Sequence, residues 1–425
     1  MMGGPAPTEM TALARRSGKG YEIMMDAEAR IAEYVDAHRE EISGTLADLV
    51  AIPSINPPGL SYRECADYLS RLLQSWEVKH ELLTIPHESH PRYAIVGAFG
   101  EGAGGLHLHG HYDVVAAQSA AQFQPRQEGG RLYGRGSSDM KGGIVAMLFA
   151  VRAIQECGVK LSRKISFTLA PDEETGGPLG IRHLAGTGLL PRDGLGMLMP
   201  EPTSGVIWHA CRGALTLRVT IRGKTAHVGL PHQGINAFEG LARVVASLLA
   251  LKPRIEERRT MLPIDPPEAN RSVMVLGGES GSGVNFNSVP ESAWFSIDRR
   301  INPEESLAQA KVELERVFDQ HRQEGMVIES AVLQEGEPAV APTDARLADL
   351  LARSVAEVTG RQPRFELCPG ILETRFFTAR GLPGYAYGPG VLEVSHGPGE
   401  YVELSSLFQC TTVYALTAVR LLLRK

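Results

Sequence analysis

The chain has 425 residues, of which 43% are hydrophobic and 22% charged, and its formal net charge is −6. This length predicts two domains with full hydrophobic cores, and the acidic balance offers no basic field for nucleic acid. The five cysteines are scattered and form no C-x-x-C pair, which argues against a disulfide framework or a thiolate metal site and favours a reducing, cytoplasmic location.

The N-terminal segment carries proline, glycine and charges where a secretory signal needs an unbroken apolar core. Residues 1–25 are therefore predicted to form a disordered leader. No stretch reaches the roughly 18 apolar residues of a membrane span. The C-terminal VYALTAVRLLLRK is predicted to be an amphipathic helix, so we expect a soluble protein without a membrane partner.

After the leader, apolar residues at helical spacing predict helices over Glu28–Ile52 and Tyr62–Trp76. Short apolar runs bounded by glycine or proline predict buried strands at Tyr93–Phe99, Leu106–Val115, Ile165–Ala170 and Leu195–Met199. A further helix is expected over Gly143–Cys157. This alternation predicts an α/β fold with a largely parallel central sheet flanked by helices.

A second domain is expected from about residue 211, because Leu215, Leu217, Val219 and Ile221 alternate strictly with polar residues. Such a strand has one buried face and one solvated face. Later elements are predicted at Asn236–Leu251 (helix), Ser272–Leu276 and Ala293–Ile301 (strands), and Glu304–His321 (helix). Together they predict a smaller α+β sandwich.

The α/β pattern resumes with a helix over Ala345–Val358, after the proline-rich turn GEPAVAPTD. The second domain is therefore expected to be inserted into the first. The predicted boundaries give the larger domain residues 26–210 and 329–425, and the inserted domain residues 211–328.

Histidines recur at strand spacing in GLHLHGHYDVV, which puts His107, His109 and His111 on one face with Asp113 next along it. A metal-ligating imidazole needs its second ring N–H held by a carboxylate, so His111 with Asp113 fits a ligand and its orienting group. A strand with hydrogen-bonded histidines is the alternative, and we expect it to hold for His107 and His109.

Carboxylates gather in two further loops. Asp139 in RLYGRGSSDMKGG precedes the predicted helix, where a carboxylate also serves as a plain N-cap. Asp172, Glu173 and Glu174 follow the strand ISFTLA, and adjacent carboxylates repel one another unless a cation lies among them. An acidic surface turn is the simpler alternative for this cluster.

Two more candidates complete the set. Glu201 ends the apolar run LGMLM between two prolines, and His396 lies in the loop VSHGPGE. All these residues lie at the carboxyl end of a predicted strand or in a loop beside one, where open α/β sheets bind ligands. Two histidines and three carboxylates without cysteine suit a hydrolytic Zn²⁺, Co²⁺ or Mn²⁺ site, and one further carboxylate is left for proton transfer.

The ordered motifs GHYDVV, LYGRGSSDMKGG, DEETGG, EPT, GKTAHVGLPHQGINA, NSVPESAWFSIDRRINP and SHGPGE resemble the metallo-aminoacylase and exopeptidase family of acetylornithine deacetylase, succinyl-diaminopimelate desuccinylase and glutamate-type carboxypeptidases. The resemblance covers nearly the whole chain after the leader. It implies a catalytic domain interrupted by an α+β lid that forms a homodimer. It also implies two divalent metal ions, for which zinc is the first expectation and cobalt or manganese are the alternatives.

Carried over by motif, the resemblance implies that His111 and Glu201 hold one metal ion and that Glu174 and His396 hold the other. Asp139 would bridge the two ions.

The resemblance further implies that Asp113 orients the first histidine and that Glu173 is the general base for a metal-bound water. In the lid, His227 would stabilise the oxyanion in the partner's active site, whereas Asn287 and Arg300 would bind the carboxylate of a small substrate. A plain surface arginine is the alternative for Arg300.

Two departures from the family pattern concern the substrate. The loop DVVAAQSAAQF lacks the usual proline, tryptophan and acidic residue, and PGILETRFF puts Glu373 where an aspartate is common. Glu373, Arg375, Tyr385 and Tyr387 are expected either to build an unusual substrate pocket or to belong to a plain core helix.

We expect the protein to be a metal-dependent amidohydrolase. The leading hypothesis is an N-acyl-amino-acid deacetylase or desuccinylase. A dipeptidase or carboxypeptidase of the same build is the nearest alternative, and hydrolysis of another C–N bond is a third. A non-catalytic metal-binding or amino-acid-binding protein is the alternative of a different class, but the presence of Glu173 beside a full ligand set argues against it.

Overall fold

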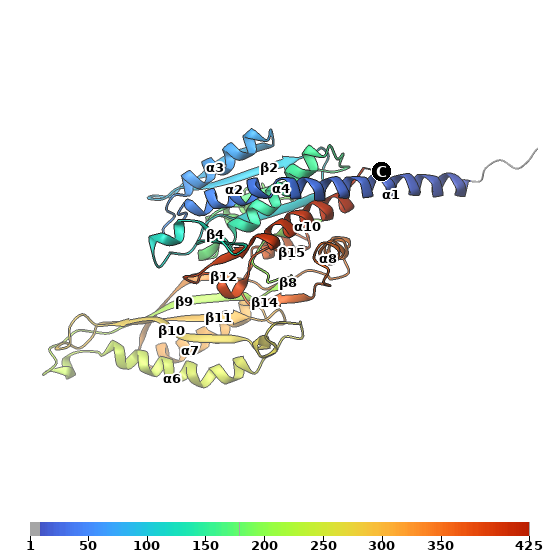
Figure 1. Ribbon diagram of the computed structural model, residues 1–425. Coiled ribbons are helices and arrows are strands. Elements are labelled where there is room, and N and C mark those ends of the chain that lie inside the picture. Colours follow the sequence, from blue (N-terminus) through green and yellow to red (C-terminus); the bar gives the residue numbers. More distant parts are fainter. Residues whose placement is uncertain (1–8, 178, 425) are drawn as a thin grey trace, which may run out of the picture. The chain divides into compact units, whose positions relative to one another are not determined.

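The computed structural model describes residues 9–177 and 179–424, which form two compact units (Figure 1). The first unit comprises the chain up to Ile207, Pro342–Arg364 and the chain from Arg380, and the second comprises Trp208–Ala341 and Phe365–Ala379. The domain boundaries expected after residues 210 and 328 stay predictions, and a strand of the second unit, β12 (Val327–Gly336), runs across the latter.

The first unit is built on a sheet with the strand order β1-β2-β6-β3-β7-β15. The strands are β1 (Lys79–Ile85), β2 (Arg92–Phe99), β3 (Leu106–His111), β6 (Ile165–Ala170), β7 (Gly196–Met199) and β15 (Gly384–Ala386). Strands β6, β3, β7 and β15 run parallel, whereas β1 and β2 pair antiparallel at one edge. This arrangement confirms the predicted α/β fold with a largely parallel sheet.

The helices of the first unit are α1 (Glu9–Ala37), α2 (Arg39–Ala51), α3 (Tyr62–Ser75), α4 (Lys141–Glu156), α5 (Ile181–Thr187), α8 (Arg346–Thr359) and α10 (Leu404–Leu422). Helix α4 lies on β3, and Gly110 allows this close approach, because a Cβ there would stand 3.1 Å from Ile144 and 3.2 Å from Met140. Helix α10 packs against α4, α8 and α1. A small sheet of β4 (Arg126–Glu128), β5 (Arg131–Tyr133) and β16 (Tyr401–Glu403) joins the two parts of this unit.

Two predictions for the N-terminal region need correction. Residues 1–8 of the predicted leader lie outside the described residues, but α1 already begins at Glu9, in a stretch rich in the good helix formers Met, Ala, Leu and Arg. The single helix predicted over Glu28–Ile52 is divided at His38. There the imidazole Nδ1 lies 2.7 Å from the carbonyl oxygen of Tyr34, which also accepts the backbone N–H of His38 at 3.1 Å.

The C-terminal helix also differs from its prediction. An amphipathic helix would expose one face to solvent, but α10 is buried over nearly all of its last three turns. The cause is that helices pack against it from several sides. Within the described residues, no helix combines the length and the apolar character that a membrane span requires.

The second unit contains a four-stranded antiparallel sheet in the order β10-β11-β9-β12. Its main elements are β9 (Gly213–Arg222), α6 (Ala237–Glu256), β10 (Val273–Ser282), β11 (Ser292–Ile301), α7 (Leu307–Gln323) and β12. Smaller elements are β8 (Ile207–Cys211), β13 (Ala339–Val340), β14 (Phe365–Cys368) and α9 (Thr374–Thr378). Leu215, Leu217 and Val219 are buried with residues of α6 and α7 in one core, as the alternating pattern predicted.

Candidate functional site

Three parallel strands of the first unit end at one edge of its sheet, and acidic or histidine side chains follow each end. β3 ends at His111, β6 is followed by Glu173 and Glu174, and β7 is followed by Glu201. Because the strands pair in parallel register, these side chains converge. The remaining members, Asp139 and His396, come from loops that precede α4 and follow β15.

The predicted ligands form two groups that share Asp139. His111, Asp139 and Glu201 form one group, and Asp139, Glu174 and His396 form the other, with ligand atoms within 4.8 Å of one another in each. Asp139 Oδ1 lies 3.3 Å from His111 Nε2, and Asp139 Oδ2 lies 3.3 Å from His396 Nε2. One carboxylate therefore faces both groups, which is the geometry of a bridging ligand.

The donor atoms of these groups suit divalent cations. In the part of the chain that the structure describes, His111 Nε2, Asp139 Oδ1 and Glu174 Oε1 are buried and accept or donate no hydrogen bond. Buried polar atoms normally have a partner, so three such atoms on residues of the two ligand groups favour bound cations there. Imidazole nitrogens with carboxylate oxygens, and no thiolate, are the donor set of hydrolytic zinc, cobalt or manganese sites.

The electrostatics of the cluster agree with a cation site. Burial raises the pKa of Glu174 to about 8. Hydrogen bonds with Asp139 and Glu174 raise the pKa of His396 to about 10. Burial alone would lower the pKa of His111, but Asp113 and Asp139 outweigh it and hold that pKa well above its ordinary value. Protonated imidazoles thus balance the carboxylates where a bound cation would otherwise do so.

Asp113 connects the first histidine to the turn after β6. Its Oδ1 lies 3.4 Å from His111 Nδ1, and its carboxylate accepts the backbone N–H groups of Glu173 (3.3 Å) and Glu174 (3.2 Å). The side chain of Glu173 is 16% exposed, and its Oε2 lies 3.9 Å from His111 Nε2. Glu173 thus lies beside the ligand atoms and within reach of solvent.

Sequence reasoning missed two groups that fix this turn. Asn56 donates from Nδ2 to Asp113 Oδ2 (2.8 Å) and to Thr175 Oγ1 (3.1 Å). Arg92 donates from Nε to both oxygens of Asp172, at 2.9 and 3.0 Å, so Asp172 takes no part in the ligand groups. No local signal could have identified either contact, because the partners lie 57 and 80 residues apart in the sequence.

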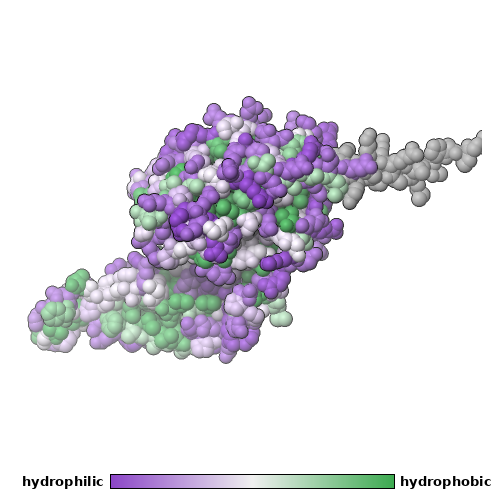
Figure 2. Space-filling model, in the orientation of Figure 1, coloured by the Kyte–Doolittle hydropathy of each residue, from purple (hydrophilic) through white to green (hydrophobic). Residues whose placement is uncertain are grey.

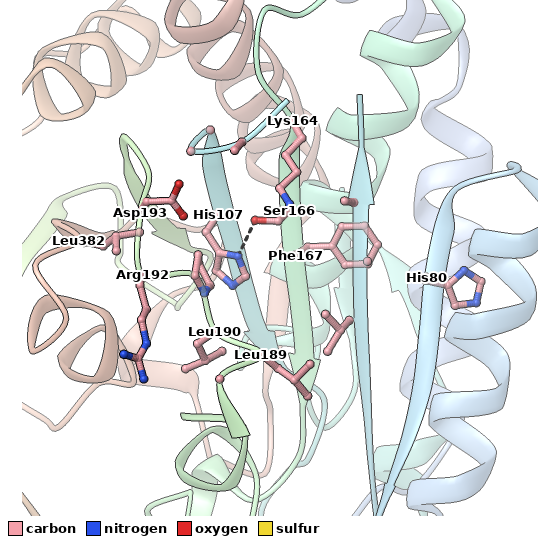
Figure 3. A pocket seen from close by; sticks show the side chains of 18 of the residues that line it. His80, His107, Lys164, Ser166, Phe167, Leu189, Leu190, Arg192, Asp193 and Leu382 are labelled. Carbon is pink, nitrogen blue, oxygen red and sulfur yellow. Dashed lines mark hydrogen bonds between the residues drawn. The ribbon is translucent and has the colours of Figure 1, made fainter. Parts of the chain in front are cut away.

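The other two histidines of β3 are hydrogen-bonded, as predicted. His107 Nδ1 lies 2.9 Å from Ser166 Oγ, and His109 Nδ1 lies 2.6 Å from Thr168 Oγ1. His107 lines a cavity of about 630 Å³ together with Lys164 and Arg192 (Figure 3). His107 lies four positions before His111 in the strand, which is about 13 Å, so this cavity belongs to the opposite end of the strand from the ligand groups.

The predicted substrate-binding residues lie in the second unit. His227 and Asn287 are exposed on adjacent segments, since His227 bridges to Ser288 and the N–H of Val228 donates to the carbonyl of Asn287 (3.1 Å). Arg300 donates to both oxygens of Asp298, at 2.7 and 3.1 Å.

The segment with the unusual PGILETRFF motif is largely buried. Glu373 is 1% exposed and directly precedes α9. Tyr385 and Tyr387, in the first unit, are also buried, and Tyr385 donates its hydroxyl to the carbonyl of Pro342 (2.6 Å). These two tyrosines fit the core alternative rather than an open pocket.

The chain is similar to one protein family and to two proteins described as desuccinylases. A model described as "Peptidase family M20/M25/M40" matches residues 107–420. A "Probable succinyl-diaminopimelate desuccinylase" of Staphylococcus epidermidis is 29% identical over 278 residues, which are 64% of this chain and 67% of that protein. A "Succinyl-diaminopimelate desuccinylase" of Xylella fastidiosa is 26% identical over 396 residues, covering 90% of this chain and 99% of that protein.

Solved structures share the fold. The dipeptidase Dug1p of Saccharomyces cerevisiae superposes with a TM-score of 0.75 at 14% sequence identity, over 92% of this chain and 98% of that chain. The match covers both units, and each unit has a counterpart in that structure.

Proposed function

The chain belongs to peptidase family M20/M25/M40 and is a metal-dependent hydrolase, and from this premise we propose that it removes the acyl group of an N-acyl amino acid. The two relatives described as succinyl-diaminopimelate desuccinylases support a substrate with a succinyl or related acyl group on nitrogen and a free carboxylate. The observation that carries the proposal is the position of Asp139 between two histidine-containing ligand groups.

In this proposal two divalent cations, zinc first or else cobalt or manganese, occupy the two groups. His111, Asp139 and Glu201 would hold one ion, and Asp139, Glu174 and His396 the other. Cations in these positions supply Lewis acidity, which polarises a carbonyl group and lowers the pKa of water.

Glu173 would move the proton in the reaction. It accepts a proton from the attacking water and gives it to the nitrogen of the leaving amine, so that the C–N bond breaks and a carboxylate and an amine are released. The exposure of Glu173 beside the buried ligand atoms supports this role. Asp113 would keep His111 oriented, and its contacts with the N–H groups of Glu173 and Glu174 would hold that turn in place.

The substrate carboxylate would bind to Arg300 and Asn287, and His227 would stabilise the oxyanion. Arg300 contacts Asp298 through Nε and one terminal nitrogen, and its side chain is 29% exposed, so a ligand can reach the guanidinium. Glu373 would contribute to acyl-group selection from its position before α9.

Two copies of the chain would also associate through the second unit to form a homodimer. Ile235, Phe238 and Leu249 are each more than half exposed there, and Figure 2 shows hydrophobic surface gathered over this unit. Apolar surface of this kind is typical of association sites. The cytoplasmic location expected from the cysteine pattern stays a prediction.

A hydrolysis panel tests the proposed function. Protein loaded with Zn²⁺, Co²⁺ or Mn²⁺ would be offered N-succinyl, N-acetyl and N-formyl amino acids beside dipeptides, and release of the free amine would be measured. We expect turnover of an N-acyl amino acid at a kcat/KM at least about tenfold above that of any dipeptide. Preference for dipeptides would assign a dipeptidase instead, and binding without turnover would assign a non-catalytic protein.

A further inference from the structure

A buried ion pair joins the loop that carries Asp139 to the loop that carries His396. Arg135 and Glu400 pair through Nη1 and Oε2, and each side chain is only 1% exposed. The two residues flank β5 and β16, which pair with each other antiparallel. Sequence reasoning gave neither residue a role, although both lie within motifs that carry the family resemblance.

Glu400 organises the backbone of the Asp139 loop. Its second oxygen, Oε1, accepts the N–H groups of Gly136 (2.9 Å), Ser138 (3.1 Å) and Asp139 (3.1 Å). Hydrogen bonds to a charged acceptor are stronger than neutral ones, and three of them converge on this one oxygen. Rotation of the Asp139 backbone would break at least one of these bonds, so Glu400 fixes the direction of the Asp139 side chain.

Arg135 holds the backbone of the loop that carries His396. Its Nη2 donates to the carbonyl oxygen of His396 at 2.9 Å. His396 has a φ of 63°, in the left-handed region that residues other than glycine rarely adopt. In this conformation its Nε2 lies 3.3 Å from Asp139 and 3.1 Å from Glu174. The hydrogen bond from Arg135 stabilises the backbone conformation that directs the imidazole to these carboxylates.

We propose that Arg135 and Glu400 form a positioning pair that fixes the separation of Asp139 and His396 and thereby sets the affinity of the metal position those two residues share. This inference rests on the proposed two-metal site. Neither residue belongs to the two ligand groups, so the pair acts through the backbone of both loops. A buried ion pair contributes little to the free energy of unfolding by itself. Because this pair contacts both ligand loops, its role is to position those loops.

Two variants test the pair. Glu400→Gln keeps the size of the side chain and one oxygen for the N–H groups but removes the charge opposite Arg135. Arg135→Lys keeps the charge opposite Glu400 but lacks the planar fork that reaches His396 at the same time. In each variant we expect the affinity for one of two Co²⁺ ions to fall by about 10-fold to 100-fold, as measured by calorimetry on metal-free protein. The visible absorption of the Co²⁺-loaded protein, which reports ligand geometry, should change as well.

Glu403→Gln is the matched control. Glu403 pairs with Arg131 at 2.7 Å across the same two strands, but these side chains are 35% and 40% exposed. Among the described residues, neither side chain has a hydrogen bond or ion pair to the loops that carry Asp139 and His396. We expect this variant to keep the Co²⁺ affinities and the absorption spectrum of the wild type.

The possible outcomes distinguish a failure of the positioning role of Arg135 and Glu400 from a failure of the proposed function. Wild-type Co²⁺ affinities and spectrum in Arg135→Lys would overturn the positioning role even if Glu400→Gln did not fold. Equal losses in Glu403→Gln would overturn it too, because any ion pair on these strands would then matter. If the wild type binds two Co²⁺ ions and hydrolyses substrate while the variants match it, only this inference fails. If the wild type binds no Co²⁺, the proposed function fails with it.

Discussion

At the scale of single residues, neighbouring carboxylates have separable roles. Glu173 and Glu174 are adjacent in the chain, yet the side chain of Glu174 is 5% exposed among ligand atoms and that of Glu173 is 16% exposed beside them. Glu174 Oε2 lies 3.1 Å from His396 Nε2 within a ligand group, whereas Glu173 belongs to neither group, so one carboxylate can bind metal while its neighbour transfers protons. Substitutions can therefore separate turnover from metal content.

Glu173→Gln should lower kcat by about 10²-fold to 10⁴-fold or more while metal content stays near that of the wild type, because a proton-transfer group is not a ligand. Steady-state kinetics and elemental analysis of the same preparation check this. Glu128→Gln, which changes an exposed carboxylate of β4, serves as the control and should leave both unchanged. Loss of metal together with activity would contradict the assigned role.

Asp139→Ala should give the opposite signature. Without the shared carboxylate, two cations would face each other uncompensated, so we expect at least one ion to be lost along with activity. Elemental analysis after dialysis measures the metal-to-protein ratio. A variant that keeps two ions per chain would rule out the bridge.

Metal binding should release protons, and its affinity should rise with pH. The ligands bind as neutral imidazole and as carboxylate, but in the metal-free protein the pKa of His396 is raised to about 10 and that of Glu174 to about 8. Below these values protons must leave before the metal binds, so lower pH weakens binding, by up to roughly tenfold per pH unit for each proton released. Calorimetry in two buffers of different ionisation enthalpy counts the protons. Binding without proton release would mean that the cluster is already deprotonated.

At the scale of elements, the turn after β6 depends on a buried contact with β2. Arg92 and Asp172 have side chains only 8% and 1% exposed, and the Tyr62 hydroxyl donates to the same carboxylate at 3.1 Å. Asp172 itself adopts a φ of 75°, so its backbone needs this support. Arg92 and Tyr62, which lie outside β6, thus stabilise the turn that carries Glu173.

Arg92→Met should destabilise the protein by about 3 to 5 kcal/mol, because it leaves the carboxylate of Asp172 buried without its cation. Urea denaturation monitored by circular dichroism measures the change. The double variant Arg92→Met/Asp172→Asn should recover part of the loss, since asparagine tolerates the left-handed conformation and carries no charge. If the single variant is as stable as the wild type, the ion pair does not hold this turn.

The sequence predicted the elements with strong periodicity and the residues next to them. Strand β6 matches its prediction from Ile165 to Ala170, and the alternation in β9 identified its buried face. The ligand candidates could be found because each lies in a recognisable motif, at a strand end or in a loop beside one. Asn56, Arg92 and the Arg135–Glu400 pair could not be assigned roles, because their roles depend on long-range contacts that no local spacing encodes. The division of the first helix at His38 was missed for a different reason, because the contact of its imidazole with the carbonyl of Tyr34 is local but is not visible in the apolar spacing.

At the scale of the whole molecule, the predicted catalytic groups are divided between the two units. The ligand groups and Glu173 belong to the first unit, whereas His227 belongs to the second and is exposed. A reaction that uses both groups can combine them either within one chain or between two copies of the chain. We predict the second case, in which His227 acts in the active site of its partner.

Complementation between inactive variants distinguishes these cases. His227→Ala and Glu173→Ala homodimers should each be inactive, but in a mixed dimer one site combines an intact Glu173 from one chain with an intact His227 from the other. Random exchange makes half of the dimers mixed, and one of two sites in each is whole, so about a quarter of wild-type activity should return. Size-exclusion chromatography with light scattering would establish the dimer, and mass spectrometry of differently tagged chains would verify exchange. Activity that stays at the level of the separate variants after verified exchange would mean that His227 serves its own chain, and a strictly monomeric protein would exclude the shared site.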